Sequence, residues 1–379
     1  MKKLPLLLML VGLALPALAA KRVSVERLGE IVTQAHDAPD AKAAQQLSNL
    51  ELTERLSTAR LEQWKTQLPG VESQRALVEL ADASVFLKLP AADIEHAAPP
   101  AEDTQHQLMA RALVSARIAL ARMPNFFATR ESLLFENLPA TQEAGHSVPG
   151  QPMHFVNRAS ATVLYRKGAE VLDTGSPDAS KAGMQEGELF SSGQFGPVLA
   201  VVLADASQGK LTWSHWERMN GASLAVFRYS VPRKLSHFSI GFSHPRFPGD
   251  AVSDRPAYSG EIALDPNNSA VLRLTLRADL KPSSPMVKSN LMVEYGPVEI
   301  AGKTYICPLR SVAFVLAHQE RSQSDGGPVF LHRAVISPAS DEPPLRTLLN
   351  DVAFTEYHIL RSDASMLKGF TAVPDANLP

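Results

Sequence analysis

The chain of 379 residues lacks several features that usually announce a function. It has one cysteine, Cys307, which excludes an internal disulfide and a zinc site built from cysteine pairs. Its formal net charge is −2 at pH 7, so there is no electrostatic basis for binding nucleic acid. Stability must therefore come from buried apolar side chains, and we expect Cys307, between Ile306 and Pro308, to be one of them.

Catalytic and metal-binding motifs are also missing. None of the 11 histidines forms a His-x-His or His-x-x-x-His pair, so we expect no metal ion and no cofactor. The Gly-His-Ser-Val-Pro-Gly run at 145–150 resembles the nucleophile elbow of hydrolases, but Pro149 stands where the elbow needs glycine. We interpret this run as a hairpin loop. Because no nucleophile is paired with a visible base, we expect no enzymatic activity.

The one long apolar run lies at the N-terminus. Lys2 and Lys3 precede apolar residues 6–15, and Ala17-Leu18-Ala19 is the small-x-small pattern that a signal peptidase recognises. The run is too short to remain as a membrane anchor. We therefore predict a signal peptide at 1–20, a periplasmic or secreted location, and no transmembrane segment after cleavage.

Residues 21–123 have the composition of a helical region, because good helix formers dominate and strand-like alternation is absent. Pro39-Asp40 opens a segment that can run past Leu50 and Thr53. Ser57 and Thr58 are N-cap residue types for a short helix that Pro69-Gly70 stops. The spacing from Leu77 to Leu87 predicts a further helix that ends before Pro90.

A connector rich in alanine and proline at 91–102 precedes the last helix of this region. Asp103 or Thr104 can cap a helix that runs to Arg122, and Pro124 ends it. Its apolar stripe has alternating spacings of four and three, which indicates a side that faces the core. The stripe consists of Met109, Leu113, Ala116, Leu120 and Met123.

After Pro124 the pattern changes to the period of two that is typical of strands. Turn chemistry at Asn220-Gly221, Asp265 to Asn268 and Ala301-Gly302 separates the runs. Short connections between neighbouring strands imply antiparallel pairing. The run at 197–203 is apolar on all sides, and Pro197 favours a helix over a strand. The predicted strands cover 127–136, 155–165, 211–217, 223–231, 236–242, 258–264, 271–280, 286–295, 303–317 and 353–360.

These patterns predict an α+β fold, in which an N-terminal helical region at 21–123 precedes a large antiparallel sheet at 124–362. A sandwich, a full barrel and a strongly curved open sheet are all compatible with many tightly connected strands. A curved sheet needs something to cover its apolar concave face, so we expect a half-barrel-like sheet with short covering helices. Residues 363–379 are expected to form a flexible tail.

Three stretches make the sheet region resemble the LolA/LolB-like periplasmic lipoprotein carriers. They are the strand–Asp-Pro turn–strand pattern at 258–274, the Tyr, Gly-containing turn and Pro-bounded strand at 291–305, and the terminal Phe-Thr-Glu-Tyr-His at 354–358. The resemblance implies a curved half-barrel around an apolar cavity. The whole chain also resembles an uncharacterised family of exported bacterial proteins, through residues 52–57, 124–130 and 293–297.

Two functions follow from these observations. The first is a non-enzymatic binding or carrier protein for an apolar ligand, such as a lipid, an acyl chain or a lipoprotein. The second is a periplasmic scaffold or regulatory module whose helical region binds a protein partner. Inward strand positions and the aromatic residues around the Asn220-Gly221 turn are the predicted lining of a ligand site, namely Trp213, Trp216, Phe227, Tyr229, Leu272, Leu274, Leu291 and Val293.

Overall fold

The computed structural model describes most of the chain outside its two ends. The predicted signal peptide, apart from Ala20, lies outside the described residues, and so does the predicted tail apart from residues 370–372. The described residues are 20–139, 141–143, 146–148, 150–173, 194–219, 221–244, 247–282, 284, 286–318, 344–360 and 370–372.

Residues 20–90 form a helical unit with a core of its own. Four helices, α1 (Val25–Ala35), α2 (Asp40–Ser48), α3 (Thr58–Lys65) and α4 (Val71–Ser84), surround the parallel strands β1 (Lys21–Val23) and β2 (Leu50–Leu52). The prediction that the second helix runs past Leu50 is wrong. The helix ends at Ser48, and the next residues pair with β1 because they bury Leu52 there.

Between residues 21 and 123, one predicted helix cap is present and another is absent. Ser57 caps α3, because its Oγ accepts a hydrogen bond from the backbone N of Arg60 at 3.4 Å. The connector contains η1 (Ala91–Asp93) and β3 (Ile94–Glu95), and α5 (Glu102–Arg122) follows it. Neither Asp103 nor Thr104 caps α5, since the helix begins before both and its N-cap is Ala101.

The rest of the described chain is dominated by one antiparallel sheet, as predicted, and its 12 described strands form an open order from β18 to β3. The order is β18-β8-β7-β4-β17-β16-β15-β14-β13-β10-β9-β3. Its strands are β4 (Phe126–Leu138), β7 (Gln151–Arg166), β8 (Ala169–Asp173), β9 (Lys210–Met219), β10 (Ala222–Val231), β13 (Ala257–Leu264), β14 (Val271–Asp279), β15 (Met286–Ile300), β16 (Lys303–His318), β17 (Leu345–Ile359) and β18 (Phe370–Ala372), with β3 at the edge.

Smaller elements lie between these strands. The loop predicted at 140–152 contains the short hairpin of β5 (Thr141–Glu143) and β6 (His146–Val148). The predicted strand at 236–242 begins later than expected, at Ile240, because η2 (Arg233–Leu235) precedes it. It is β11 (Ile240–His244), and it pairs with β12 (Phe247–Asp254), which the sequence pattern did not indicate. Pro197 begins α7 (Pro197–Gln208), so the helical interpretation of that run is confirmed.

Two details of the sheet differ from the predictions. The strand predicted at 286–295 is longer, because β15 continues through Gly296 and Pro297, and the chain reverses at the predicted turn of Ala301 and Gly302, which have φ of 51° and 76°. Alternation across 155–165 predicts that Phe155 and Val163 share a face, but the register shifts by one residue between them and places them on different faces. Phe155 packs with Phe135 instead.

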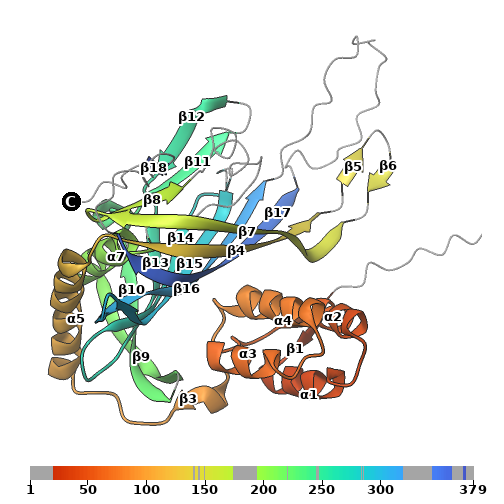
Figure 1. The fold of residues 1–379 in the computed structure, drawn as a ribbon, viewed down its shortest axis with the longest axis horizontal. Helices are drawn as coiled ribbons and strands as arrows, with labels where there is room; N and C mark the ends of the chain where they lie inside the picture. The colour runs from red at the N-terminus through yellow and green to blue at the C-terminus, as the bar shows by residue number, and fades with distance from the viewer. Residues whose placement is uncertain are drawn as a thin grey trace, which may run out of the picture.

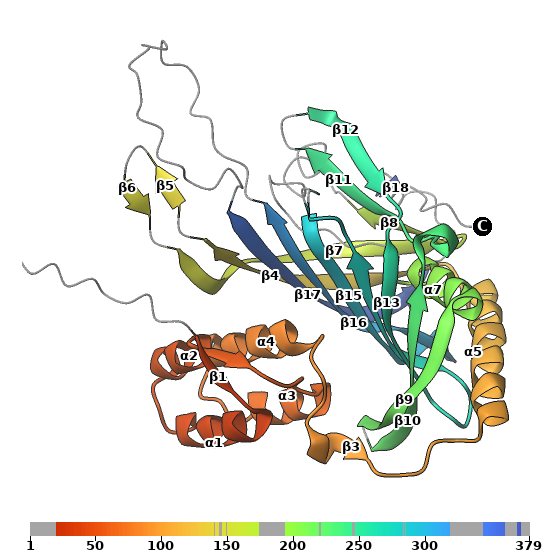
Figure 2. The same cartoon turned by 180° about the vertical axis from the view of Figure 1, so that it is seen from behind.

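The two faces of the sheet are covered by different helices. Alternating residues of β14 point to opposite faces: Leu274 and Leu276 pack with α5 and α7. On the other face, Arg277 donates to the Phe86 carbonyl of the helical unit, and Arg273 pairs with Glu217, which also pairs with Arg55 of that unit. Figures 1 and 2 show the helical unit against the part of the sheet formed by β4, β17 and β16, with α5 and α7 near β9 and β10. The curved sheet is therefore enclosed by helices from both sides.

Candidate functional site at the junction of the helical unit and the sheet

The residues predicted to line a ligand site are largely brought together, but against helices. Phe227, Tyr229, Leu274 and Val293 are buried in one cluster with α5 and α7, and Trp213, Trp216 and Leu291 pack on its margin. Leu272 belongs to a different cluster, with Leu224, Val226 and Ala263. Seven of the eight positions thus share one region, whose apolar side chains contact the chain's own helices.

The aromatic residues around the Asn220-Gly221 turn form the predicted cross-strand group. Trp213 lies directly opposite Phe227, with ring centroids 5.5 Å apart at 87°. A register shift between Val226 and Phe227 places Trp213 and Trp216 side by side, 4.9 Å apart. Trp216 also donates its indole N–H to the Ala98 carbonyl at 2.9 Å. These rings therefore tie the connector to the sheet.

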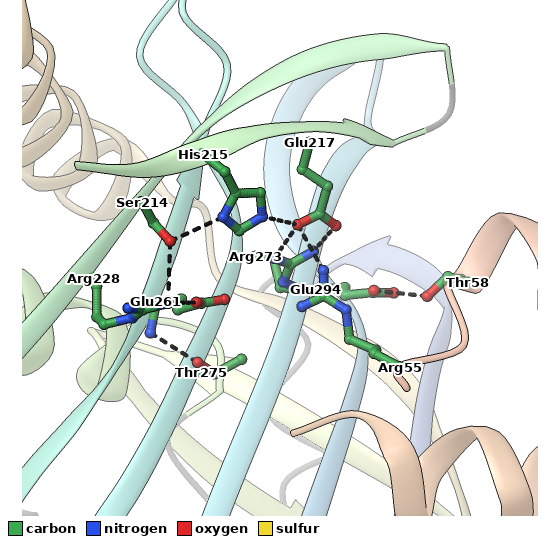
Figure 3. A network of polar contacts seen from close by, with 10 residues as sticks. All are labelled: Arg55, Thr58, Ser214, His215, Glu217, Arg228, Glu261, Arg273, Thr275 and Glu294. Carbon is green, nitrogen blue, oxygen red and sulfur yellow. Dashed lines mark hydrogen bonds and ion pairs between the residues drawn. The ribbon is translucent and has the colours of Figure 1, made fainter. Parts of the chain in front are cut away.

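On the opposite face, a buried network of charges joins the sheet to the helical unit (Figure 3). Glu217 of β9 is its centre: it makes two contacts with the guanidinium of Arg273, the Oε2 contact being 2.7 Å, and lies 2.7 Å from Arg55. The side chains of these three residues are only 4–5% exposed. His215 Nε2 lies 3.5 Å from Glu217 as well. One carboxylate therefore pairs with two buried arginines.

The electrostatics of Glu217 follow from this arrangement. Burial alone would raise the pKa of its carboxyl, but Arg273, the nearby His215 and Arg55 together hold the pKa far below its ordinary value. Burial and the nearby charge of Arg273 lower the pKa of the Arg55 guanidinium, whereas Glu217 opposes this. The network stabilises the junction only while all its members are present.

Local structure fixes Arg55 at the end of the helical unit. It lies in the segment between β2 and α3, where its backbone N donates to the Lys88 carbonyl at 2.8 Å. The next residue, Leu56, donates its N–H to the Ser84 hydroxyl at 3.0 Å. Three positions after Arg55, Thr58 donates its hydroxyl to Glu294 of β15 at 2.7 Å. A short segment therefore carries two separate contacts to the sheet.

A second group of charges lies under α4. Arg310 of β16 pairs with Asp82 of α4 and, at 2.8 Å, with Asp351 of β17. Asp82 is fully buried, and its Oδ2 atom has no hydrogen-bond partner among the described residues. Glu79 lies one turn earlier on α4 and is 7% exposed; burial raises its pKa to about 8. Glu79 is thus largely protonated at neutral pH.

Both charge groups border one small pocket. Its lining includes Arg55, Thr58, Glu217, Glu294 and Arg310. The pocket holds about 20 Å³, which is room for a water molecule and not for an organic ligand. The arrangement can hold the helical unit in place and exchange protons with solvent, but it offers no space for a substrate.

These residues form no recognisable motif in the sequence. Two of the stretches on which the resemblance to an exported family rests, residues 52–57 and 293–297, contain Arg55 and Glu294, and the structure places both at the junction. A further signal was available in β14, where Arg273 stands between Leu272 and Leu274. A charge inside an apolar strand needs a buried partner, although its identity is not readable from sequence.

A separate polar cluster lies at the end of α7. Asp205, 1% exposed, accepts hydrogen bonds from the backbone N of His237 at 2.8 Å and from the Tyr258 hydroxyl at 2.7 Å. His237 Nδ1 also lies 2.6 Å from Asp205 Oδ1. No serine or cysteine contact to this pair is present among the described residues, so we interpret it as a structural tie between α7 and the chain that follows β10.

Cys307 is a buried core residue, as predicted. Its side chain packs with Phe126 and Phe354, and burial raises the pKa of the thiol to about 12. Within the described ranges, no group of three or more His, Cys, Asp or Glu side chains is arranged to hold a metal ion. None of the described helices combines the length and the apolar character that a membrane span requires.

The architecture is an open, curved antiparallel sheet with helices on both faces, and comparisons with known proteins add little to it. No family model matches the chain, and no curated protein matches its sequence. It is similar to a putative outer membrane lipoprotein-sorting protein domain from Vibrio parahaemolyticus, at 8% identity and a TM-score of 0.27 over 68% of this chain and 94% of that one. It is also similar to MucB in complex with MucA(peri), at 12% identity and a TM-score of 0.20 over 65% and 93%. Both TM-scores are too low to support a conclusion about function.

Proposed function

We propose that this chain is an exported, non-enzymatic module that binds a protein partner. The observation that supports the proposal is that the chain's own helices cover the apolar face of the sheet. Seven of the eight side chains predicted to line a ligand site pack with α5 and α7, so an acyl chain would have to displace the protein's own helices. A carrier with a preformed site would instead keep a large apolar cavity. Export rests on the signal-peptide pattern at residues 1–20.

The outer side of α5 supplies a surface for such a partner. Val114 and Ile118 are 55% and 45% exposed, and residues four apart lie on the same side of a helix. Their opposite neighbours Leu108 and Ala112 are buried against the sheet cluster. Large apolar side chains left in water on a rigid helix are typical of contact sites, and an apolar groove on the partner would cover them.

The test treats the periplasm with a lysine-reactive cross-linker and then purifies the full chain together with any protein attached to it. We expect the wild type to capture a partner, and we expect the amount of captured partner to fall at least tenfold in the V114D/I118D double variant. The matched control is Val156→Asp on β7, which changes an apolar residue of similar exposure, 42%, on another surface. Equal capture by the double variant and the control would contradict the proposed surface.

A carrier function for an apolar ligand is the second proposal, because one observation favours it. Phe135, Met292, Val312 and Leu349 form an apolar area of the sheet that the helical unit covers through Val85 and its neighbour Phe86. Movement of the unit would expose this area, and a lipid covering it would gain about 25 cal/mol per Å².

Native mass spectrometry of the mature protein, followed by lipid extraction, separates the two proposals. A stoichiometric co-purified lipid would favour the carrier and identify its ligand class. A mass that stays unchanged after incubation with phospholipid vesicles would count against the carrier and leave the protein-binding module.

A further inference from the structure

One side of α4 faces the sheet and carries acidic groups in its middle. Arg75, Glu79 and Asp82 follow each other at spacings of four and three, so they share one side of the helix. Arg75 lies over the Phe155 ring at 3.9 Å, and Asp82 contacts Arg310 of β16. Glu79 lies between these two contacts, and only 7% of its surface is exposed. The carboxyl of Glu79 is therefore enclosed where the helical unit meets the sheet.

Glu79 stands apart from the ion pairs of the junction. Among the described residues, Arg310 pairs with both Asp82 and Asp351, and Arg55 and Arg273 share Glu217. None of these ion pairs includes Glu79, although its side chain is buried. A buried carboxylate without a counterion is costly, so Glu79 must hold a proton while the units are docked.

Several charged residues on the elements packed against α4 have partners other than Glu79. Asp40 of α2 accepts hydrogen bonds from the first turn of α4, Glu51 of β2 lies 4.0 Å from Arg22, and Asp351 of β17 pairs with Arg310. Others are Arg60 and Lys65 of α3, paired with Asp93 and Glu62, His154 and Arg158 of β7, near Glu136 and Glu131, and Arg346 of β17, paired with Glu136.

We propose that the junction is a proton-controlled clamp: the helical unit stays docked while α4 presents protonated carboxyl groups to the sheet, and it loosens when they ionise. Glu79 is the main titrating group. Burial raises its pKa to about 8. Burial also raises the pKa of Asp82; the nearby Arg310 opposes this rise, and the acidic groups Asp351, Glu294 and Glu79 add to it. The clamp does not depend on which partner or ligand the protein binds.

The direction of the pH effect follows from proton linkage. The ordinary pKa of glutamate is 4.5, and in the docked state it is about 8. Between these values the docked state binds more protons than the separated units, so docking weakens as pH rises. One proton changes the separation equilibrium about tenfold per pH unit inside this window, which amounts to roughly 50-fold between pH 6 and pH 8 because the effect levels off near the upper value.

Hydrogen-exchange mass spectrometry of the full chain at pH 6 and pH 8, corrected for intrinsic exchange rates, tests the clamp. We expect the opening of residues 75–86 and 308–316 to increase roughly 50-fold in the wild type and less than about threefold in Glu79→Gln. Glu131→Gln is the control, because Glu131 is a half-exposed acid paired with Arg158, and its profile should match the wild type. Exchange in residues 258–264, inside the sheet, should not follow the change.

A Glu79→Gln variant that keeps the wild-type slope would overturn the clamp. The wild-type protein alone also decides the matter, should the variant fold poorly: a junction whose exchange does not change between pH 6 and pH 8 contradicts the proposal. A slope shared by residues 258–264 would mean global unfolding and would contradict it equally.

Discussion

Replacing Glu217 with glutamine should destabilise the protein more than any other single charge change at the junction. Glutamine keeps the shape of the side chain and removes its charge, so Arg55 and Arg273, both about 95% buried, would lose the carboxylate that they share. Removal of one partner from a buried ion pair costs roughly 3–5 kcal/mol. Since folded domains are stable by only about 5–15 kcal/mol, this is a large part of the free energy of unfolding.

Urea unfolding followed by tryptophan fluorescence measures this effect, because Trp213 and Trp216 lie on the same strand as Glu217. Glu131→Gln is the matched control: Glu131 and its partner Arg158 are 42% and 62% exposed, and such a pair contributes under about 1 kcal/mol. The triple variant R55M/E217L/R273M should recover most of the loss, because an apolar set of similar volume needs no counterion. An E217Q loss no larger than that of E131Q would refute the reasoning.

Three further predictions concern other parts of the fold. Gly260→Ala should cost at least about 2 kcal/mol in urea unfolding, because the added Cβ would lie 1.8 Å from the Thr275 carbonyl oxygen; a neutral result would mean that β13 and β14 can separate freely. Asp205→Ala should cost about 2–4 kcal/mol, since the Tyr258 hydroxyl and the His237 backbone N–H would lose their acceptor, whereas Asp254→Ala at the half-exposed Arg233 pair should change little. Cys307 should react with a thiol reagent such as DTNB only as fast as the protein unfolds, up to pH 9, because the thiol is buried and its pKa is about 12; rapid reaction of the folded protein would contradict its place in the core.

The sequence predicted those parts of the fold that depend on neighbouring residues. Pro197 placed the start of α7, Ser57 placed the cap of α3, and the Ala301-Gly302 turn placed the longest hairpin. The strand at Leu50–Leu52 was missed because its partner is β1, about 30 residues earlier, and because three residues are too few to show a period. The change of face at Phe155 was missed for a similar reason, since a bulge is a property of the pair of strands.

The junction could not be predicted because its contacts join distant residues. Arg273 meets Glu217 from 56 residues away, and Thr58 meets Glu294 from 236 residues away. The local pattern shows a charge in an apolar strand and nothing of what neutralises it. The predicted lining of a cavity was grouped well for the opposite reason, because alternation in a sheet places side chains on one face, but alternation does not tell whether a helix or a ligand covers that face.

The pairing of β4 with β17 has a consequence for the order in which the chain folds. These strands are neighbours in the sheet, yet Thr129 and Glu356 meet across 227 residues. The core of the helical unit, by contrast, is built almost entirely from residues 23–81. Contacts between distant residues form slowly because a long loop must close first. A chain that emerges from its N-terminus can therefore complete the helical unit early, whereas the sheet must wait for β17, and its unpaired strands need protection from aggregation until then.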